Sequence, residues 1–122
     1  MTSFRQGDIV LVPFPFTDED TTKKRPAVVL SGAWFNNSSE EIILGYVTSN
    51  VPPVLDQDMV IIKGSEVKSA GLVKVSVAKA GKIFTIKQDR IIKKMGKLSR
   101  ATSLKVLTEV RRTMDNNFNP KD

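Results

Sequence analysis

Short apolar runs, separated by polar or turn-forming stretches, make up most of the chain. The runs are rich in valine, isoleucine and phenylalanine, which is typical of β-strands, and each is about as long as an ordinary strand. Over residues 72–78 apolar and polar side chains alternate, as in a half-buried strand. We therefore predict strands over residues 8–16, 26–30, 41–47, 57–63, 72–78 and 80–86.

The first two runs flank a polar insert. Pro13 and Pro15 cannot donate a hydrogen bond to a neighbouring strand, so we expect the far end of the first strand at a sheet edge. Residues 26–30 are continuously apolar, which is typical of a strand buried on both faces. Residues 17–24 hold three acids, three threonines and two lysines without a glycine, and this composition predicts a solvated, mobile loop.

Turn-forming residues fill the gaps between later runs. Residues 32–40 contain a cluster of Asn and Ser, so we predict an irregular loop that closes a hairpin. A turn is predicted at residues 64–66, which begin with glycine. Asp89 can cap a short helix over residues 90–95, which Gly96 would end.

A longer helix is predicted over residues 100–116. Its apolar side chains Leu104, Leu107, Val110 and Met114 recur every three or four positions. This spacing is typical of core packing, and we assign no partner helix to it.

The order of these elements defines the expected fold. Short, closely spaced strands followed by helices predict a mainly β (α+β) protein: a small, strongly bent sheet or barrel with short helices and a C-terminal helix. The chain has 122 residues, enough for one hydrophobic core. We expect a single domain over residues 1–122.

The whole chain has a formal net charge of +6, and its basic residues are concentrated in the second half. Residues 79–112 hold eleven Lys or Arg against two acids, whereas residues 1–78 hold seven against nine. Clustered basic side chains bind polyanions because they neutralise phosphates and release counterions. The asymmetry indicates a polyanionic partner, nucleic acid first; the alternative is a solvated helical face.

The residue types that the chain lacks limit the kinds of catalytic and metal-binding site that it can form. The chain has no His and no Cys, which removes the commonest acid–base side chain, thiol nucleophiles and most transition-metal ligands. Neither common glycine-rich phosphate loop occurs. The acidic stretches 18–20 and 56–58 are candidates for a hard cation, but both lie in turn-rich sequence, and we interpret them as solvated loops. We expect neither a metal nor a cofactor.

No apolar run approaches the roughly 20 residues that a membrane-spanning helix requires. No apolar signal-peptide segment is visible, and without Cys there is no disulfide framework. These features predict a soluble, cytoplasmic protein with no membrane partner.

Arg25 and Thr48 remain as candidates for chemistry, each at one end of an apolar strand. If consecutive strands pair antiparallel, both side chains can reach one bound phosphate. The guanidinium can bind two phosphate oxygens and stabilise a five-coordinate phosphorus, and the hydroxyl adds a hydrogen bond. Such a pair suits metal-free RNA cleavage by the substrate's own 2′-OH. Arginine is a poor general base near neutrality, so Arg25 would act as an electrostatic clamp or proton donor.

The residues by themselves leave a second interpretation open. Arg25 can instead pair with Asp20 on the surface, and Thr48 can cap a turn.

Four segments point to a known family. They are G-D-I-V-L-V-P-F-P-F-T-D, then K-R-P-A-V-V-L-S, then V-T-S, then G-K-I-F-T-I followed by I-I-K-K-M-G-K-L-S. In this order and spacing they resemble the MazF/PemK family of toxin endoribonucleases, particularly its PemK-like members. The resemblance runs from about Gly7 to Ser99, with the last helix in the expected place.

The resemblance implies a small SH3-like barrel of the type shared by CcdB, MazF and PemK, with short helices and a C-terminal helix. It implies a homodimer that cleaves single-stranded RNA without a metal and leaves 2′,3′-cyclic phosphate and 5′-hydroxyl ends. It also implies a cognate antitoxin whose disordered segment covers the RNA groove. Operator DNA would be bound only through that antitoxin.

The same resemblance implies roles for individual residues. The catalytic arginine of the family falls on Arg25 and its catalytic hydroxyl residue on Thr48. Residues 16–24 would form a loop that gates the groove. The residues expected to contact RNA are Phe16, Thr17, Lys23, Lys24, Ser31, Ser49 and Asn50.

The first loop departs from the family pattern. It lacks the G-x-E-Q-x-G segment of many MazF members and carries Asp18, Glu19 and Asp20 instead. These acids would repel RNA phosphates, so the neighbouring basic side chains must offset them or the loop must swing away. The alternative function is a non-catalytic member of the fold: an RNA- or antitoxin-binding protein, or a gyrase poison resembling CcdB. CcdB-like poisons end on Trp-Gly-Ile, which this chain lacks.

Overall fold

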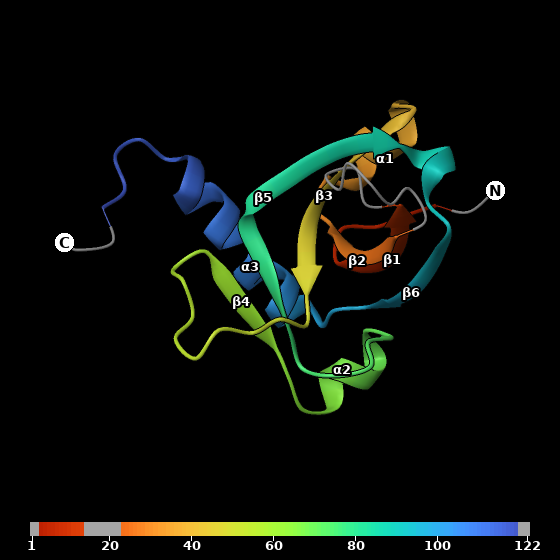
Figure 1. Cartoon of the computed structure of the whole chain (residues 1–122). Helices are drawn as coiled ribbons and strands as arrows, with labels where there is room; N and C mark the ends of the chain where they lie inside the picture. The colour runs from red at the N-terminus through yellow and green to blue at the C-terminus, as the bar shows by residue number, and fades with distance from the viewer. Residues whose placement is uncertain (1–2, 14–22, 120–122) are drawn as a thin grey trace.

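The computed structural model describes residues 3–13 and 23–119. Over these residues the chain forms six strands, three α-helices and one 3-10 helix (Figure 1). The strands are β1 (Asp8–Pro13), β2 (Lys24–Val29), β3 (Glu41–Thr48), β4 (Met59–Ile62), β5 (Ser76–Lys87) and β6 (Lys93–Lys97). The helices are α1 (Ala33–Ser38), α2 (Ser65–Ser69), the 3-10 turn η1 (Gln88–Arg90) and α3 (Arg100–Met114).

The strands form one antiparallel sheet in the order β4-β5-β3-β2-β1-β6. The sheet curls into a half-barrel, and α3 packs against β4 and β5 (Figure 1). The predicted mainly β fold, with a small bent sheet, short helices and a C-terminal helix, is confirmed.

The central strands bury both of their faces. Along β2, Val28 faces one core while Ala27 and Val29 face the other, because successive side chains of a strand point to opposite sides. All three are at most 1% exposed, as the continuous apolar run predicts. β1 ends at Pro13, whose only strand partner in the described residues is Lys24 of β2.

Two predicted loops contain helices instead. Residues 33–38 form α1, because the side chain of Asn36 is buried and donates to the carbonyl oxygens of Ser31 and Phe4 (both 3.0 Å). The expected turn at residues 64–66 is the start of α2. Both helices have six residues or fewer, too short for a hydrophobic period to reveal them.

The predicted helix over residues 90–95 is wrong. This segment enters β6, which pairs with the open side of β1. The flanking amides of Ile92 and Leu98 donate to the carbonyl oxygens of Leu11 (2.8 Å) and Gly7 (2.9 Å). A vacant strand edge therefore decides the conformation of a segment whose local helix signals are weak.

The predicted strands 72–78 and 80–86 are also revised. Only residues from Ser76 onward are in a strand, and β5 continues without a break to Lys87. Val73 and Val75 are 97% and 40% exposed, so the alternation that predicted a half-buried strand does not describe this connection.

The C-terminal helix is confirmed, but its apolar stripe is only partly in the core. Val106 is buried at 2% exposure, whereas Leu104 is 47% and Met114 is 65% exposed. The assignment of the whole stripe to core packing is therefore wrong for these two side chains.

Glu66 on α2 is hydrogen-bonded to the start of α3. Its carboxylate accepts hydrogen bonds from the backbone N–H of Ser99 (2.7 Å) and from the hydroxyl of Thr102 (2.7 Å). Ser99 caps the helix, because its hydroxyl accepts a hydrogen bond from the N–H of Thr102 (3.2 Å). The start of α3 thus depends on a carboxylate from another helix.

Glu66 should make stability depend on pH. Burial raises the pKa of Glu66, but the hydrogen bonds from Thr102 and Ser99 outweigh it and hold the pKa below its ordinary value of 4.5. A carboxyl whose pKa falls on folding adds stability above its ordinary pKa, and this contribution is lost as pH falls through the folded value. We expect Glu66→Gln to lower the free energy of unfolding by about 1–2 kcal/mol at neutral pH, and by less in acid.

Urea unfolding of both proteins at neutral pH and below about pH 4 measures this difference. Glu40→Gln, at an exposed carboxylate, is the control and should leave the free energy of unfolding unchanged. If Glu66→Gln is as stable as the parent at neutral pH, the hydrogen bonds of Glu66 with Ser99 and Thr102 do not stabilise the fold as proposed.

Candidate functional site

The register of β2 and β3 brings Arg25 and Thr48 to the same end of the sheet. The two strands pair from Ala27 opposite Tyr46 to Val29 opposite Leu44. Continuing this register by two residues places Arg25 directly opposite Thr48. Both are half-buried, at the start of one strand and the end of its neighbour.

A pocket of about 180 Å³ lies at this point. Strand ends form one side of it, and the connection before β5 together with β6 forms the other. Its lining residues are Arg25, Pro26, Val47, Thr48, Ser49, Leu72, Val73, Lys74 and Met95. The guanidinium residue and the hydroxyl residue singled out in the sequence therefore share one small cavity.

The Thr48 hydroxyl is held by the turn that follows β3. Its Oγ1 accepts a hydrogen bond from the backbone N–H of Asn50 (3.1 Å), and the N–H of Val51 donates to the carbonyl oxygen of Ser49 (3.0 Å). A hydroxyl that accepts from the backbone still has its own proton to donate. Capping a turn and donating to a ligand are thus compatible for Thr48.

Four other expected contact residues gather around the pair. Lys23 and Lys24 are exposed at the start of β2, beside Arg25, and Ser49 and Asn50 are exposed directly after Thr48. Of these, Ser49 lines the pocket itself. Phe16 and Thr17 lie outside the described residues.

Ser31 is not part of this cluster. It follows the other end of β2 and is 8% exposed. Its hydroxyl donates to the side chain of Asn36 and accepts from the backbone N–H of Ile43 (3.1 Å). The Ser31 hydroxyl thus has structural partners beside α1, and its expected contact with RNA stays a prediction.

Three residues near Arg25 and Thr48 were not identified as site residues from the sequence. The ammonium groups of Lys79 and Lys82 lie 5.7 and 5.3 Å from the centre of the Tyr46 ring. Tyr46 is two residues before Thr48 on β3, so the two side chains share a face of the sheet. Pairing residues 76–87 with β3 as one strand would have revealed the cluster.

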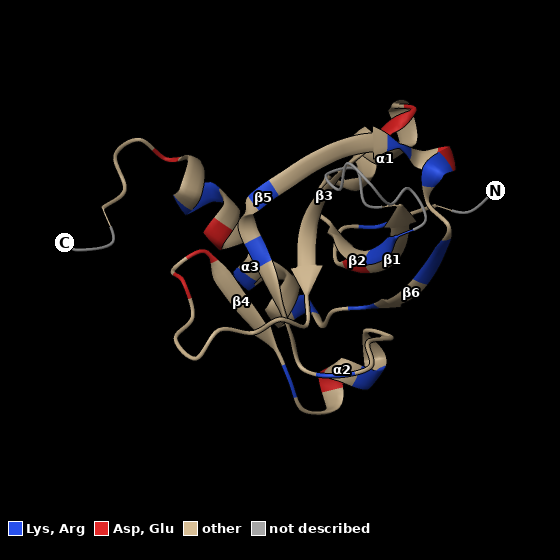
Figure 2. Ribbon diagram, in the orientation of Figure 1, with Lys and Arg blue, Asp and Glu red and all other residues tan. Residues whose placement is uncertain are grey.

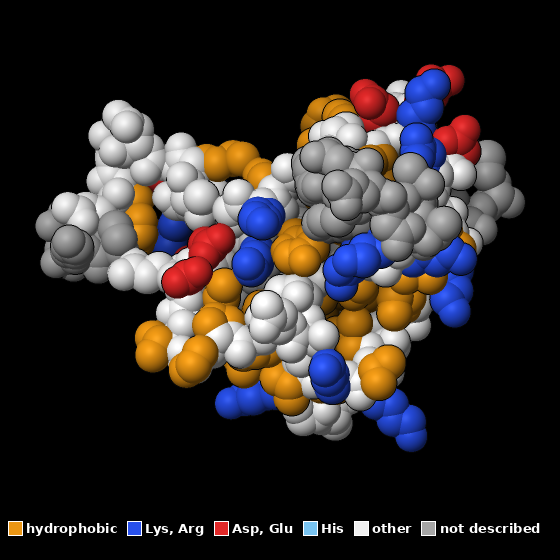
Figure 3. Space-filling view, in the orientation of Figure 1, with side chains coloured by type: hydrophobic (Ala, Val, Ile, Leu, Met, Phe, Trp, Pro, Cys, Tyr) orange, Lys and Arg blue, Asp and Glu red, His pale blue; other side chains and the backbone are white. Residues whose placement is uncertain are grey.

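Charge supports this face as a site for anions. β5 and β6 carry Lys residues along their length (Figure 2), and basic side chains border a small hydrophobic patch at the centre of the face shown in Figure 3. Within the described part of the chain, no group of three or more acidic side chains is arranged to hold a metal ion. None of the described helices has the length and apolar character needed to cross a membrane.

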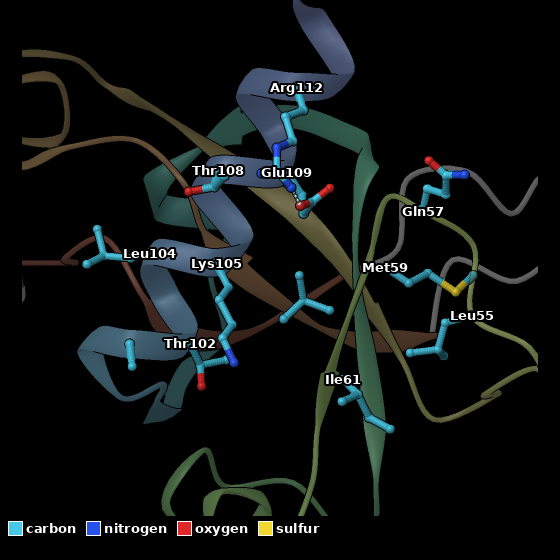
Figure 4. Close-up of a pocket in the computed structure, with 12 residues that line it drawn as sticks. Leu55, Gln57, Met59, Ile61, Thr102, Leu104, Lys105, Thr108, Glu109 and Arg112 are labelled. Carbon is cyan, nitrogen blue, oxygen red and sulfur yellow. Dashed lines mark hydrogen bonds and ion pairs between the residues drawn. The ribbon is translucent and has the colours of Figure 1, made fainter. Parts of the chain in front are cut away.

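A larger hollow of about 520 Å³ lies elsewhere, between α3 and β4. Figure 4 shows Leu104, Lys105 and Glu109 of the helix on one side of it, and Met59 with Leu55 of the strand and its preceding loop on the other. The hollow has neither Arg25 nor Thr48 in its lining, so we place the candidate chemistry in the smaller pocket.

A curled, mainly β half-barrel with a C-terminal helix, carrying a basic pocket where two strands end, places the protein in the MazF-like fold class. The chain belongs to the family of PemK-like, MazF-like toxins of type II toxin–antitoxin systems, whose family model matches residues 5–114. No curated protein matches the sequence.

Solved structures agree with this fold. An endoribonuclease in complex with its cognate antitoxin, from a mycobacterial species, has a TM-score of 0.76 at 14% identity, covering 96% of this chain and 100% of that one. MazF from Deinococcus radiodurans has a TM-score of 0.71 at 18% identity, covering 91% and 96%. Toxin MazF-mt6 from Mycobacterium tuberculosis has a TM-score of 0.71 at 15% identity, covering 91% and 99%. At these identities the likeness shows the fold.

Proposed function

We propose that this toxin is an endoribonuclease that cleaves single-stranded RNA without a metal ion. The observation that carries the proposal is the small pocket shared by Arg25 and Thr48 at the ends of β2 and β3. Membership of a toxin family and the fold of RNA-cleaving toxins support it.

In the proposed reaction the 2′-oxygen of RNA bonds to the adjacent phosphorus while the bond to the 5′-oxygen of the next nucleotide breaks. The 2′-OH gives its proton to water, and the departing 5′-oxygen takes a proton from water. The products are a 2′,3′-cyclic phosphate and a 5′-hydroxyl. The nucleophile belongs to the substrate, so the protein has only to position the phosphate and stabilise its charge.

Arg25 is proposed to stabilise the extra negative charge on the five-coordinate phosphorus. A guanidinium fork binds two oxygens at once, and its charge is worth more in a half-buried pocket than in water. Thr48, whose hydroxyl accepts from the N–H of Asn50, is proposed to donate a hydrogen bond to a phosphate oxygen. Lys23, Lys24, Ser49 and Asn50 are proposed to contact the RNA on either side.

The same family membership leads us to propose two partners. The first is a cognate antitoxin, as in the mycobacterial complex, with operator DNA bound only through it. The second is another copy of the chain. The hollow between α3 and β4 supports a homodimer, because Leu104 and Leu55 are 47% and 36% exposed there (Figure 4).

The chemistry of the RNA ends tests the proposed reaction. In the presence of EDTA, the protein should cut single-stranded RNA into fragments whose 5′ ends accept phosphate from a kinase without prior dephosphorylation. Their 3′ ends should be cyclic phosphates by mass. RNA with 2′-O-methyl groups throughout is the control and should remain intact, because its nucleophile is blocked. Cleavage of the methylated RNA, or loss of all cleavage in EDTA, would contradict the mechanism.

A further inference from the structure

β5 contains a bulge beside the candidate site. Gly45 of β3 lies opposite Ile83, but the next residue, Tyr46, lies opposite Lys79. Residues 80–82 therefore have no partner on β3, and the strand is displaced locally. Bulges of this kind redirect side chains next to functional sites.

Asp58, in the loop before β4, holds the bulge in place. Its carbonyl oxygen accepts a hydrogen bond from the N–H of Ala80 (2.9 Å), and its carboxylate accepts one from the N–H of Gly81 (3.0 Å). The fit is close, since a Cβ on Gly81 would lie 2.7 Å from that carboxylate oxygen. One acidic residue thus accepts hydrogen bonds from the first two amides of the bulge.

The bulge places two lysines over one aromatic ring. Lys79 precedes the bulge and Lys82 is its last residue, and their ammonium groups lie 5.7 and 5.3 Å from the Tyr46 ring centre. In the described residues no carboxylate lies within ion-pair distance of either ammonium group. The ring attracts both cations, and it brings two like charges together without neutralising them.

This pair of charges lies on the same face as the candidate catalytic residues. Tyr46 and Lys79 are cross-strand partners, so their side chains point the same way. Thr48 is two residues further along β3, about 7 Å away, and Arg25 continues the same row on β2. An RNA strand with its scissile phosphate at Arg25 and Thr48 would bring a neighbouring phosphate toward the lysines.

We propose that Lys79, Lys82 and Tyr46 form a second RNA subsite, which binds the phosphate next to the scissile one, and that Asp58 positions it by holding the bulge. The proposal rests on the proposed ribonuclease function. On this proposal the acidic residue Asp58 favours RNA binding, whereas its negative charge by itself would oppose it.

The first test measures binding without cleavage. The probe is a random-sequence pool of single-stranded 2′-O-methyl RNA, titrated at several salt concentrations. The double variant Lys79→Ala/Lys82→Ala should bind about three- to tenfold more weakly and should lower the salt slope by about 0.7, the value for one phosphate contact on a single strand. Lys87→Ala, on the far end of the same strand, is the control and should change neither quantity by as much. Unchanged affinity and slope in the double variant would overturn the subsite.

The second test concerns Asp58. Removing an acid should strengthen RNA binding if only net charge matters, and Asp56→Ala, at an exposed acid in the same loop, should show that effect or none. Asp58→Ala should instead weaken binding about threefold or more, because the N–H of Gly81 loses its side-chain acceptor. Asp58→Asn keeps an oxygen for the N–H of Gly81 and should restore binding. Stronger binding by Asp58→Ala would refute the positioning role.

These outcomes are separable from the ribonuclease assignment, because the methylated probe reports binding alone. If the lysine variants weaken binding while the parent protein cuts no unmodified RNA, the subsite stands and the catalytic proposal fails. Thermal unfolding of each variant checks that it is folded. Lys82→Gln, at an exposed position, repeats the lysine test with a smaller change in side-chain length.

Discussion

Replacing Arg25 by alanine should lower the rate of RNA cleavage by about a hundredfold or more, and the protein should remain folded. A charged donor that stabilises the developing charge at phosphorus is worth on the order of 3 kcal/mol in the transition state. Arg25 is half-buried at a strand end, outside both hydrophobic cores, so its loss should cost little stability. Single-turnover cleavage of one RNA by both proteins, with thermal unfolding alongside, measures the two effects.

One further variant separates charge from geometry at this position, and variants at other positions serve as comparisons. Arg25→Lys keeps the positive charge but loses the planar fork, and it should recover only part of the rate. Arg90→Ala removes an exposed arginine from η1 and should cleave at the parent rate. Thr48→Ala should also be slow, whereas Thr85→Ala, at an exposed threonine of β5, should not. A normal rate for Arg25→Ala would remove this residue from the mechanism and favour a non-catalytic role for the protein.

Replacing Gly71 by alanine should destabilise the protein by about 3 kcal/mol or more, because two penalties add. Gly71 has a φ of +75°, which L-residues disfavour. A Cβ there would also lie 2.2 Å from the carbonyl oxygen of Met95 on β6, and backbone atoms cannot move aside as a flexible side chain can. Because Leu72 and Met95 both line the candidate pocket, the variant should cleave RNA poorly even where it is folded.

Gly64 provides a comparison at which the steric contact is absent. Its φ is +64°, similar to that of Gly71, but a Cβ there would meet nothing within 4 Å. Its ψ of −143° lies outside the left-handed helical region, in a conformation that non-glycine residues rarely adopt, so Gly64→Ala should show a backbone penalty alone, on the order of 1–3 kcal/mol. Urea unfolding of the two variants compares a backbone penalty with and without a close contact, and a smaller loss for Gly71→Ala than for Gly64→Ala would mean that the contact with β6 is unimportant.

Local sequence pattern predicted the elements whose environment is regular over many residues. The buried run in β2 and the 3.6-residue period of α3 are encoded by neighbouring side chains, so both elements were found from the sequence. The short segments were not. α1 exists because Asn36 reaches Ser31 and Phe4, and β6 because β1 offers it an unpaired edge. These partners are distant along the chain, and a local pattern carries no information about them.

Some features of the candidate site were likewise found from the sequence, and others only from the structure. The sequence by itself determined the fold class, the basic character of the second half and the two residues, Arg25 and Thr48, on which the proposed chemistry depends. Only the tertiary structure decided what surrounds them. Ser31 lies beyond the end of β2 opposite to Arg25. Residues 76–87 form one strand, whose bulge lies beside Tyr46. The physical reason is that strand register and close contacts between distant segments, rather than periodicity, determine which side chains share a pocket.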